Sequence, residues 1–149
     1  MNKRNILKVA KAIETAAKKK EGLRGKLGFN MAKVCGDAGV ITDRVDSCGT
    51  VACIAGWSYA IRYPSTTPRR LTELARGAIG WWDLDLTNRV ISEAADFLGL
   101  AENDARDLFM GEGVDLEIED VTPAHAVAVL RHLAATGKVD WSVGAVSHV

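Results

Sequence analysis

Cysteine and histidine are the residues whose side chains could do chemistry in this chain most directly, and the stretch DSCGTVACIAGW holds two of its three cysteines. Cys48 precedes an apolar run that we expect to be helical from Thr50. Unpaired backbone N–H groups at a helix N-terminus lower the pKa of a nearby thiol. A nucleophilic thiol also needs a base, and only three histidines are present. If the protein is an enzyme, we expect Cys48 as the nucleophile and His125 as its base.

Packing is the alternative role for the same cysteines. Cysteine is among the most buried residue types, so Cys53, inside the run, is expected in the core. A zinc site needs four ligands, usually in closely spaced pairs. The spacings of thirteen and five residues between Cys35, Cys48 and Cys53 match no common zinc module, so no metal or other cofactor is predicted. The sequence also lacks phosphate-loop, nucleophile-elbow and zinc-protease motifs, which favours a non-enzymatic role.

Helical periodicity dominates the chain and predicts a mainly α protein. We expect a single compact helical domain over residues 1–149, with about six helices and room for a small β element. The run from Thr50 to Arg62 is apolar around nearly its whole circumference, which predicts a helix buried on most sides. The expected helices cover residues 3–20, 50–62, 69–78, 87–98, 102–109 and 123–136, and the expected extended pieces cover residues 28–34, 40–42 and 114–118.

Capping residues set the ends of several expected helices. Asn2 is expected to cap the first helix, and the Thr122-Pro123 pair predicts the start of the last one. Gly99 and Gly137 are expected to end helices. His125, at the third position of the last helix, is expected to be exposed or hydrogen-bonded. Trp141 is expected to pack against the body of the domain.

The charge is polarised along the chain, although the formal net charge is zero. Residues 1–34 carry ten Lys and Arg against Glu14 and Glu21, a balance of +8. Residues 83–120 carry twelve Asp and Glu against two Arg, a balance of −10. Such blocks are often solvated faces, but they can also attract a partner of opposite charge. Whether the two blocks neutralise each other is left open by the sequence.

Three groups of residues are candidates for binding a partner. The first is the basic run at the end of the first helix, and the second lies in YPSTTPRRLTELAR, where arginines near Tyr59 and Tyr63 could contact phosphates or bases. The third is a pair of adjacent tryptophans, one of which is expected at an interface because tryptophan is enriched at binding hot spots. The candidate binding residues are Lys18, Lys19, Lys20, Arg69, Arg70, Trp81 and Trp82.

The segments CGTVACIAGW, FLGLAENDARDLF and VTPAHAVAVLRHLAATGKVDW together resemble a group of small uncharacterised proteins of bacteriophage and proteobacterial genomes. The resemblance covers residues 2–141 and brings no established activity, so it assigns no catalytic residue. It implies a context, because small phage-encoded accessory proteins often act by binding host factors.

The leading interpretation is therefore a non-enzymatic, phage-related binding protein that acts on a host or phage macromolecule, as an inhibitor of a host defence or regulatory protein in its most specific form. Two alternatives remain open: a cysteine-dependent enzyme or thiol site at Cys48, and a nucleic-acid-binding accessory protein. No stretch is apolar for long enough to span a membrane. The basic N-terminus lacks the apolar region of a secretion signal, so we expect a location in the cytoplasm of the bacterial host.

Overall fold

The computed structural model describes residues 1–18, 28–29, 36–37, 50–67, 70, 89–110 and 121–144. Over these residues the protein is mainly helical, as predicted. The helices are α1 (Lys3–Lys18), α2 (Ile54–Arg62), α4 (Arg89–Leu98), α5 (Glu102–Met110) and α6 (Pro123–Thr136). Three short strand pieces accompany them: β1 (Gly28–Phe29), β2 (Gly36–Asp37) and β3 (Thr50–Ala52).

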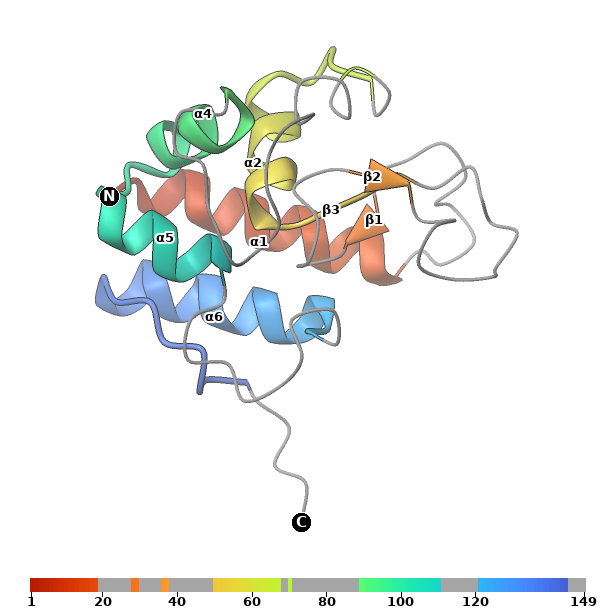
Figure 1. Ribbon diagram of the computed structural model, residues 1–149. Coiled ribbons are helices and arrows are strands. Elements are labelled where there is room, and N and C mark those ends of the chain that lie inside the picture. The colour runs from red at the N-terminus through yellow and green to blue at the C-terminus, as the bar shows by residue number, and fades with distance from the viewer. Residues whose placement is uncertain are drawn as a thin grey trace.

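Helix α1 is the long central element of the arrangement in Figure 1, where it crosses the molecule horizontally. It packs against α6 on one side and against α2 and α4 on the other. The strands lie at the far end of α1 from the N-terminus, in the order β1-β3-β2. β3 runs parallel to β1 and antiparallel to β2, so that Val51 lies opposite both Gly28 and Gly36.

One hydrophobic core joins all five described helices. α1 contributes Ile6, Val9 and Ile13 at helical spacing, which puts them on one face of the helix. Each of the other helices adds at least one large side chain with no exposed surface. These side chains are Ile54 from α2, Ile91 and Leu98 from α4, Leu108 from α5, and Leu130 and Leu133 from α6.

The capping residues act as predicted. The Asn2 side chain accepts a hydrogen bond from the Asn5 backbone N–H at 3.1 Å, and Thr122 Oγ1 accepts one from the His125 backbone N–H at 3.1 Å. These bonds satisfy N–H groups that the first turn of a helix leaves unpaired. Gly99 and Gly137 have φ values of 67° and 78°, the left-handed conformation that commonly ends a helix.

The start of the second expected helix was wrong by four residues. Residues 50–52 form strand β3, and α2 begins only at Ile54, after Cys53 as its N-cap. Thr50 and Val51 are β-branched, which favours extended backbone, and pairing with β1 and β2 holds them in a sheet. The expected burial of the helix is confirmed, because every residue from Ile54 to Tyr59 is buried.

The remaining expected elements lie partly outside the described residues. Arg70 is helical, whereas the rest of the expected helix 69–78 and residues 87–88 are not described. The expected extended pieces at 40–42 and 114–118 also lie outside the described ranges. The count of about six helices therefore stays a prediction.

Candidate functional site

Most of the candidate site residues taken from the sequence lie outside the described part of the chain. The backbone of Lys18 closes α1, but its side chain is not described. Arg70 and His125 are described in full. The residues outside the description are Cys48, Lys19, Lys20, Arg69, Trp81 and Trp82.

The helix N-terminus expected beside Cys48 belongs instead to Cys53. Because α2 begins at Ile54, the favourable effect of the helix N-terminus on a thiol falls on Cys53 and is not adjacent to Cys48 in the sequence. Cys53 is 2% exposed and belongs to the hydrophobic core, which confirms its expected packing role. A reactive Cys48 stays a prediction. The helix expected to lower the pKa of its thiol begins only at Ile54.

His125 is buried and hydrogen-bonded, not exposed. Its Nε2 lies 2.9 Å from the backbone carbonyl oxygen of Trp141, and the two rings meet edge to face with centroids 5.4 Å apart. A carbonyl oxygen can only accept, so Nε2 carries a proton and donates it. This nitrogen is therefore unable to take a proton from a thiol while the bond is kept. Among the described residues, no group of three His, Cys, Asp or Glu side chains could hold a metal ion.

Trp141 ties the chain after α6 to α5. Its indole Nε1 donates a hydrogen bond of 2.9 Å to the backbone carbonyl oxygen of Asp107. Asp107 lies in the last turn of α5, where carbonyl groups have no partner within the helix. Trp141 is 2% exposed, so its expected packing against the body is confirmed. The His125 and Trp141 pair thus holds α5, α6 and the following segment together.

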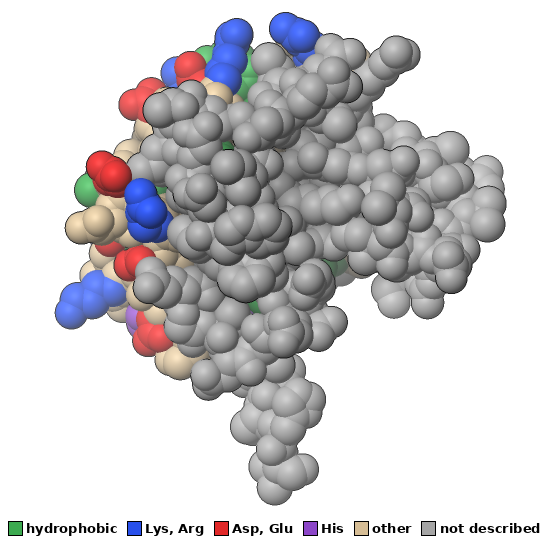
Figure 2. All heavy atoms as spheres, viewed as in Figure 1, with side chains coloured by type: hydrophobic (Ala, Val, Ile, Leu, Met, Phe, Trp, Pro, Cys, Tyr) green, Lys and Arg blue, Asp and Glu red, His purple; other side chains and the backbone are tan. Residues whose placement is uncertain are grey.

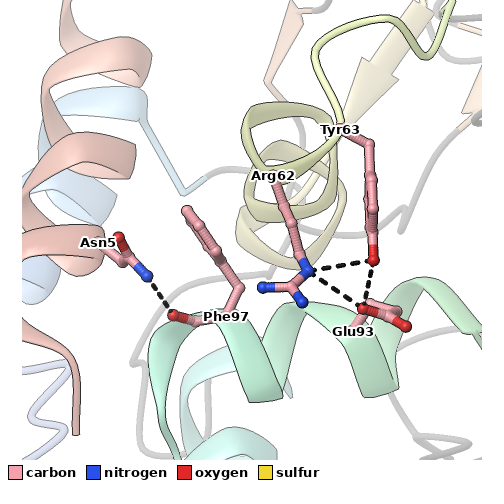
Figure 3. A network of polar contacts seen from close by, with 5 residues as sticks. All are labelled: Asn5, Arg62, Tyr63, Glu93 and Phe97. Carbon is pink, nitrogen blue, oxygen red and sulfur yellow. Dashed lines mark hydrogen bonds and ion pairs between the residues drawn. The ribbon is translucent and has the colours of Figure 1, made fainter.

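Arg62 and Tyr63 at the end of α2 form a polar network with Glu93 of α4 (Figure 3). Arg62 Nε donates to Tyr63 Oη at 3.1 Å and lies 3.3 Å from Glu93 Oε2. Tyr63 Oη donates to the same carboxylate at 2.9 Å. The hydrogen bond to Tyr63 is the main cause that raises the pKa of Arg62 above its ordinary value. Tyr59 is buried, with its ring centroid 4.9 Å from that of Tyr63.

This network joins α2 to α4. Tyr59 and Tyr63, which the sequence suggested as neighbours of a phosphate- or base-binding site, contact other parts of the protein. Tyr59 faces the core, and the hydroxyl of Tyr63 is engaged with Glu93. Arg70 is exposed, and its backbone N–H donates to Thr67 Oγ1 at 3.1 Å, a cap at the start of a helical turn. The described residues around Tyr59 and Tyr63 thus mainly form a contact between α2 and α4.

Helix α1 carries a different cationic surface, which we call the basic face of α1. It consists of the exposed side chains Lys3, Arg4, Lys8 and Lys11. Arg4, Lys8 and Lys11 follow a spacing of four and three residues, so they form one row about 10 Å long on the helix surface. Within the described part of the chain, none of these four cations forms an ion pair.

The single carboxylate in the sequence of α1 is already paired. Glu14 Oε2 lies 2.9 Å from Arg131 Nη2 on α6, so the ion pair crosses the contact between the two helices. The sequence of α6 contains no acidic residue, and its exposed side includes Ala124, Arg131 and Ala135. Glu14 is therefore the one negative side chain on two adjacent helices.

Two described acidic side chains of the block at residues 83–120 form ion pairs, and neither pairs with the basic face of α1. Glu93 pairs with Arg62, and Glu102 pairs with Arg106 within α5 at 3.5 Å. In the view of Figure 2, acidic and basic side chains are interspersed along the described edge of the molecule. Among the described residues, the acids of α4 and α5 thus do not neutralise the basic face of α1.

The run selected from the sequence, Lys18 to Lys20, has no described side chain, so its role in binding stays a prediction. The described exposed cations of α1 begin at Lys3. The same periodicity that predicted the buried face of α1 also predicts which lysines face solvent, so this signal was present in the sequence.

No helix among the described residues is long and apolar enough to cross a membrane.

Comparison of the chain with models of protein families, with curated proteins and with solved structures finds no match.

Proposed function

We propose that this chain is a non-enzymatic binding protein that engages an acidic macromolecule of a host or phage through the basic face of α1. The observation that carries the proposal is that Lys3, Arg4, Lys8 and Lys11 are exposed together and form no ion pair among the described residues. The phage context of the resemblance belongs to the same proposal, as does its specific form, inhibition of a host defence or regulatory protein.

A cluster of unpaired cations favours association with an acidic surface for two reasons. It raises the rate of encounter, because opposite charges steer the partner toward the face. It also disfavours partners of like charge, which gives some selectivity. The sequence of α6 adds no carboxylate beside it, and Glu14, the one carboxylate of α1, is paired with Arg131.

The thiol alternative has less support from the geometry. The helix N-terminus expected to activate Cys48 begins after Cys53, and the Nε2 atom of His125 is engaged with the Trp141 carbonyl. Alkylation of Cys48 at a rate typical of an ordinary thiol would agree with the binding proposal. Rapid alkylation with a pKa well below the usual value would favour the thiol site instead.

Affinity capture from bacterial lysate with paired variants tests the proposal. Lys8→Glu with Lys11→Glu reverses two charges in the row on α1, and Arg89→Glu with Lys138→Glu reverses two exposed charges elsewhere. All four side chains are exposed, so folding should be unaffected, which circular dichroism verifies. We expect the wild type and the Arg89/Lys138 control to retain the same partner at low salt, and the Lys8/Lys11 variant to lose it. Retention of that partner by the Lys8/Lys11 variant, or the absence of any captured partner, would contradict the proposal.

A further inference from the structure

A large apolar side chain lies within the basic face of α1. Leu7 is 47% exposed, and the described residues contain only one other large apolar side chain that is exposed, Met1. Leu7 is four residues from both Lys3 and Lys11, so these cations are its neighbours along the helix surface. The face therefore combines an apolar centre with a cationic surround.

We infer that the partner bound by this face is an acidic protein segment that places an apolar side chain against Leu7. The inference rests on the proposed function and specifies the chemistry of the partner. Protein interfaces commonly have an apolar centre inside a polar rim, and the rim excludes water from the central contact. Lys3, Lys8 and Lys11 would face carboxylates of the partner, and Leu7 would lose its exposed surface to an apolar side chain.

The position of Leu7 favours a protein over a nucleic acid. Contacts to a phosphate backbone are made by cations and hydrogen-bond donors, and their contribution depends on the number of phosphates neutralised. An exposed leucine among these cations adds nothing to phosphate binding. Against an apolar side chain, by contrast, burial of the exposed part of Leu7 is favourable.

Binding of three labelled probes, measured by fluorescence anisotropy, tests the inference on the full chain. Two are synthetic peptides of equal length and equal negative charge, one with leucine and the other with glutamine at helical spacing. The third is a DNA duplex. The protein variants are Leu7→Gln and the double charge reversal Lys8→Glu with Lys11→Glu. Glutamine has a helix propensity close to that of leucine, so Leu7→Gln should leave α1 intact.

We expect the wild type to bind the leucine peptide about ten-fold more tightly than the glutamine peptide, and Leu7→Gln to remove that difference. The double charge reversal should weaken binding of both peptides. Equal affinity of the wild type for the two peptides would overturn the inference, as would preferential binding of the DNA duplex with a steep salt dependence. In either of these cases the Lys8/Lys11 variant would still lose binding, and the proposed function would stand. If none of the three probes binds the wild type at low salt, or the Lys8/Lys11 variant binds as well as the wild type, the proposed function fails together with the inference.

Discussion

Glu14 Oε2 on α1 and Arg131 Nη2 on α6 lie 2.9 Å apart, although 116 residues separate them in the sequence. The pair neutralises the one carboxylate in α1, and the exposed lysines Lys3, Lys8 and Lys11 of that helix form no ion pair among the described residues. The charge of the face therefore depends on how α1 and α6 pack together.

Replacement of Glu14 by Gln should strengthen binding of an acidic partner. The change removes one negative charge from the edge of the basic face and keeps the size of the side chain. Because the Glu14 and Arg131 side chains are 33% and 52% exposed, loss of their ion pair should lower the free energy of unfolding by less than about 1 kcal/mol. Urea unfolding measures the stability, and anisotropy with the leucine peptide measures the affinity. A loss of affinity as large as that of the Lys8/Lys11 variant would contradict the expected direction.

Truncation of Trp141 to Ala should destabilise the protein by about 3–5 kcal/mol, because a buried indole is removed and the Asp107 carbonyl loses its donor. Trp141→Phe keeps most of the packing, so it should cost about 1–3 kcal/mol for the unsatisfied carbonyl. Chemical denaturation compares the two with Lys138→Ala, an exposed control in the same segment after α6. Equal stability of Trp141→Ala and the wild type would show that the segment after α6 does not contribute to the fold.

Gly99 should be more sensitive to substitution than Gly137. Both have positive φ, so alanine at either position meets the same backbone strain of about 1–2 kcal/mol. A Cβ at Gly99 would also lie 2.9 Å from the backbone nitrogen of Asn2, whereas at Gly137 the nearest atom is the flexible end of Met1 at 3.8 Å. The Asn2 N–H donates to the Leu98 carbonyl at 2.9 Å, so the clash would displace the start of α1.

Thermal unfolding of Gly99→Ala and Gly137→Ala measures this difference. We expect the lower melting temperature for Gly99→Ala. The reverse order would mean that the chain before α1 moves aside without loss of stability.

Asp140 should contribute stability that depends on pH. Hydrogen bonds from the Ser142 hydroxyl at 2.6 Å and the Ser142 backbone N–H at 2.9 Å lower the pKa of its carboxyl below the ordinary value of 3.8. A lowered folded-state pKa means that the stabilisation is fully present above the unfolded-state pKa and is lost as the pH falls through the folded-state value. Asp140→Asn should therefore be less stable than the wild type at neutral pH, and the difference should disappear in strong acid. Thermal unfolding of both proteins at neutral pH and in strong acid tests this. A stability difference that does not change with pH would exclude the ionised Asp140 carboxylate as its cause.

The helix ends could be predicted well where the signal is local. The boundaries of α6 follow from Thr122-Pro123 at one end and Gly137 at the other, and both act within a few residues of the chain. The same reasoning failed at residues 50–53. An apolar run is compatible with a buried helix or a buried strand, and the strand here depends on pairing with residues 28–29 and 36–37, which local patterns do not specify.

The candidate site could be predicted only in its general character. The periodicity of α1 shows that lysines face away from the core, but it does not show which of them lack an acidic partner. That depends on the packing of α6, which places Arg131 beside Glu14. The burial of His125 likewise depends on Trp141, a contact made sixteen residues along the chain.

Site-specific photo-crosslinking tests the central claim most directly. A photoreactive amino acid is placed at Lys11, on the basic face of α1, or at Lys138, which is exposed after α6. Each protein is then irradiated in bacterial lysate at low salt. We expect a discrete covalent adduct with an acidic partner from position 11 and no such adduct from position 138. The same adduct from position 138, together with none from position 11, would show that binding occurs on another surface.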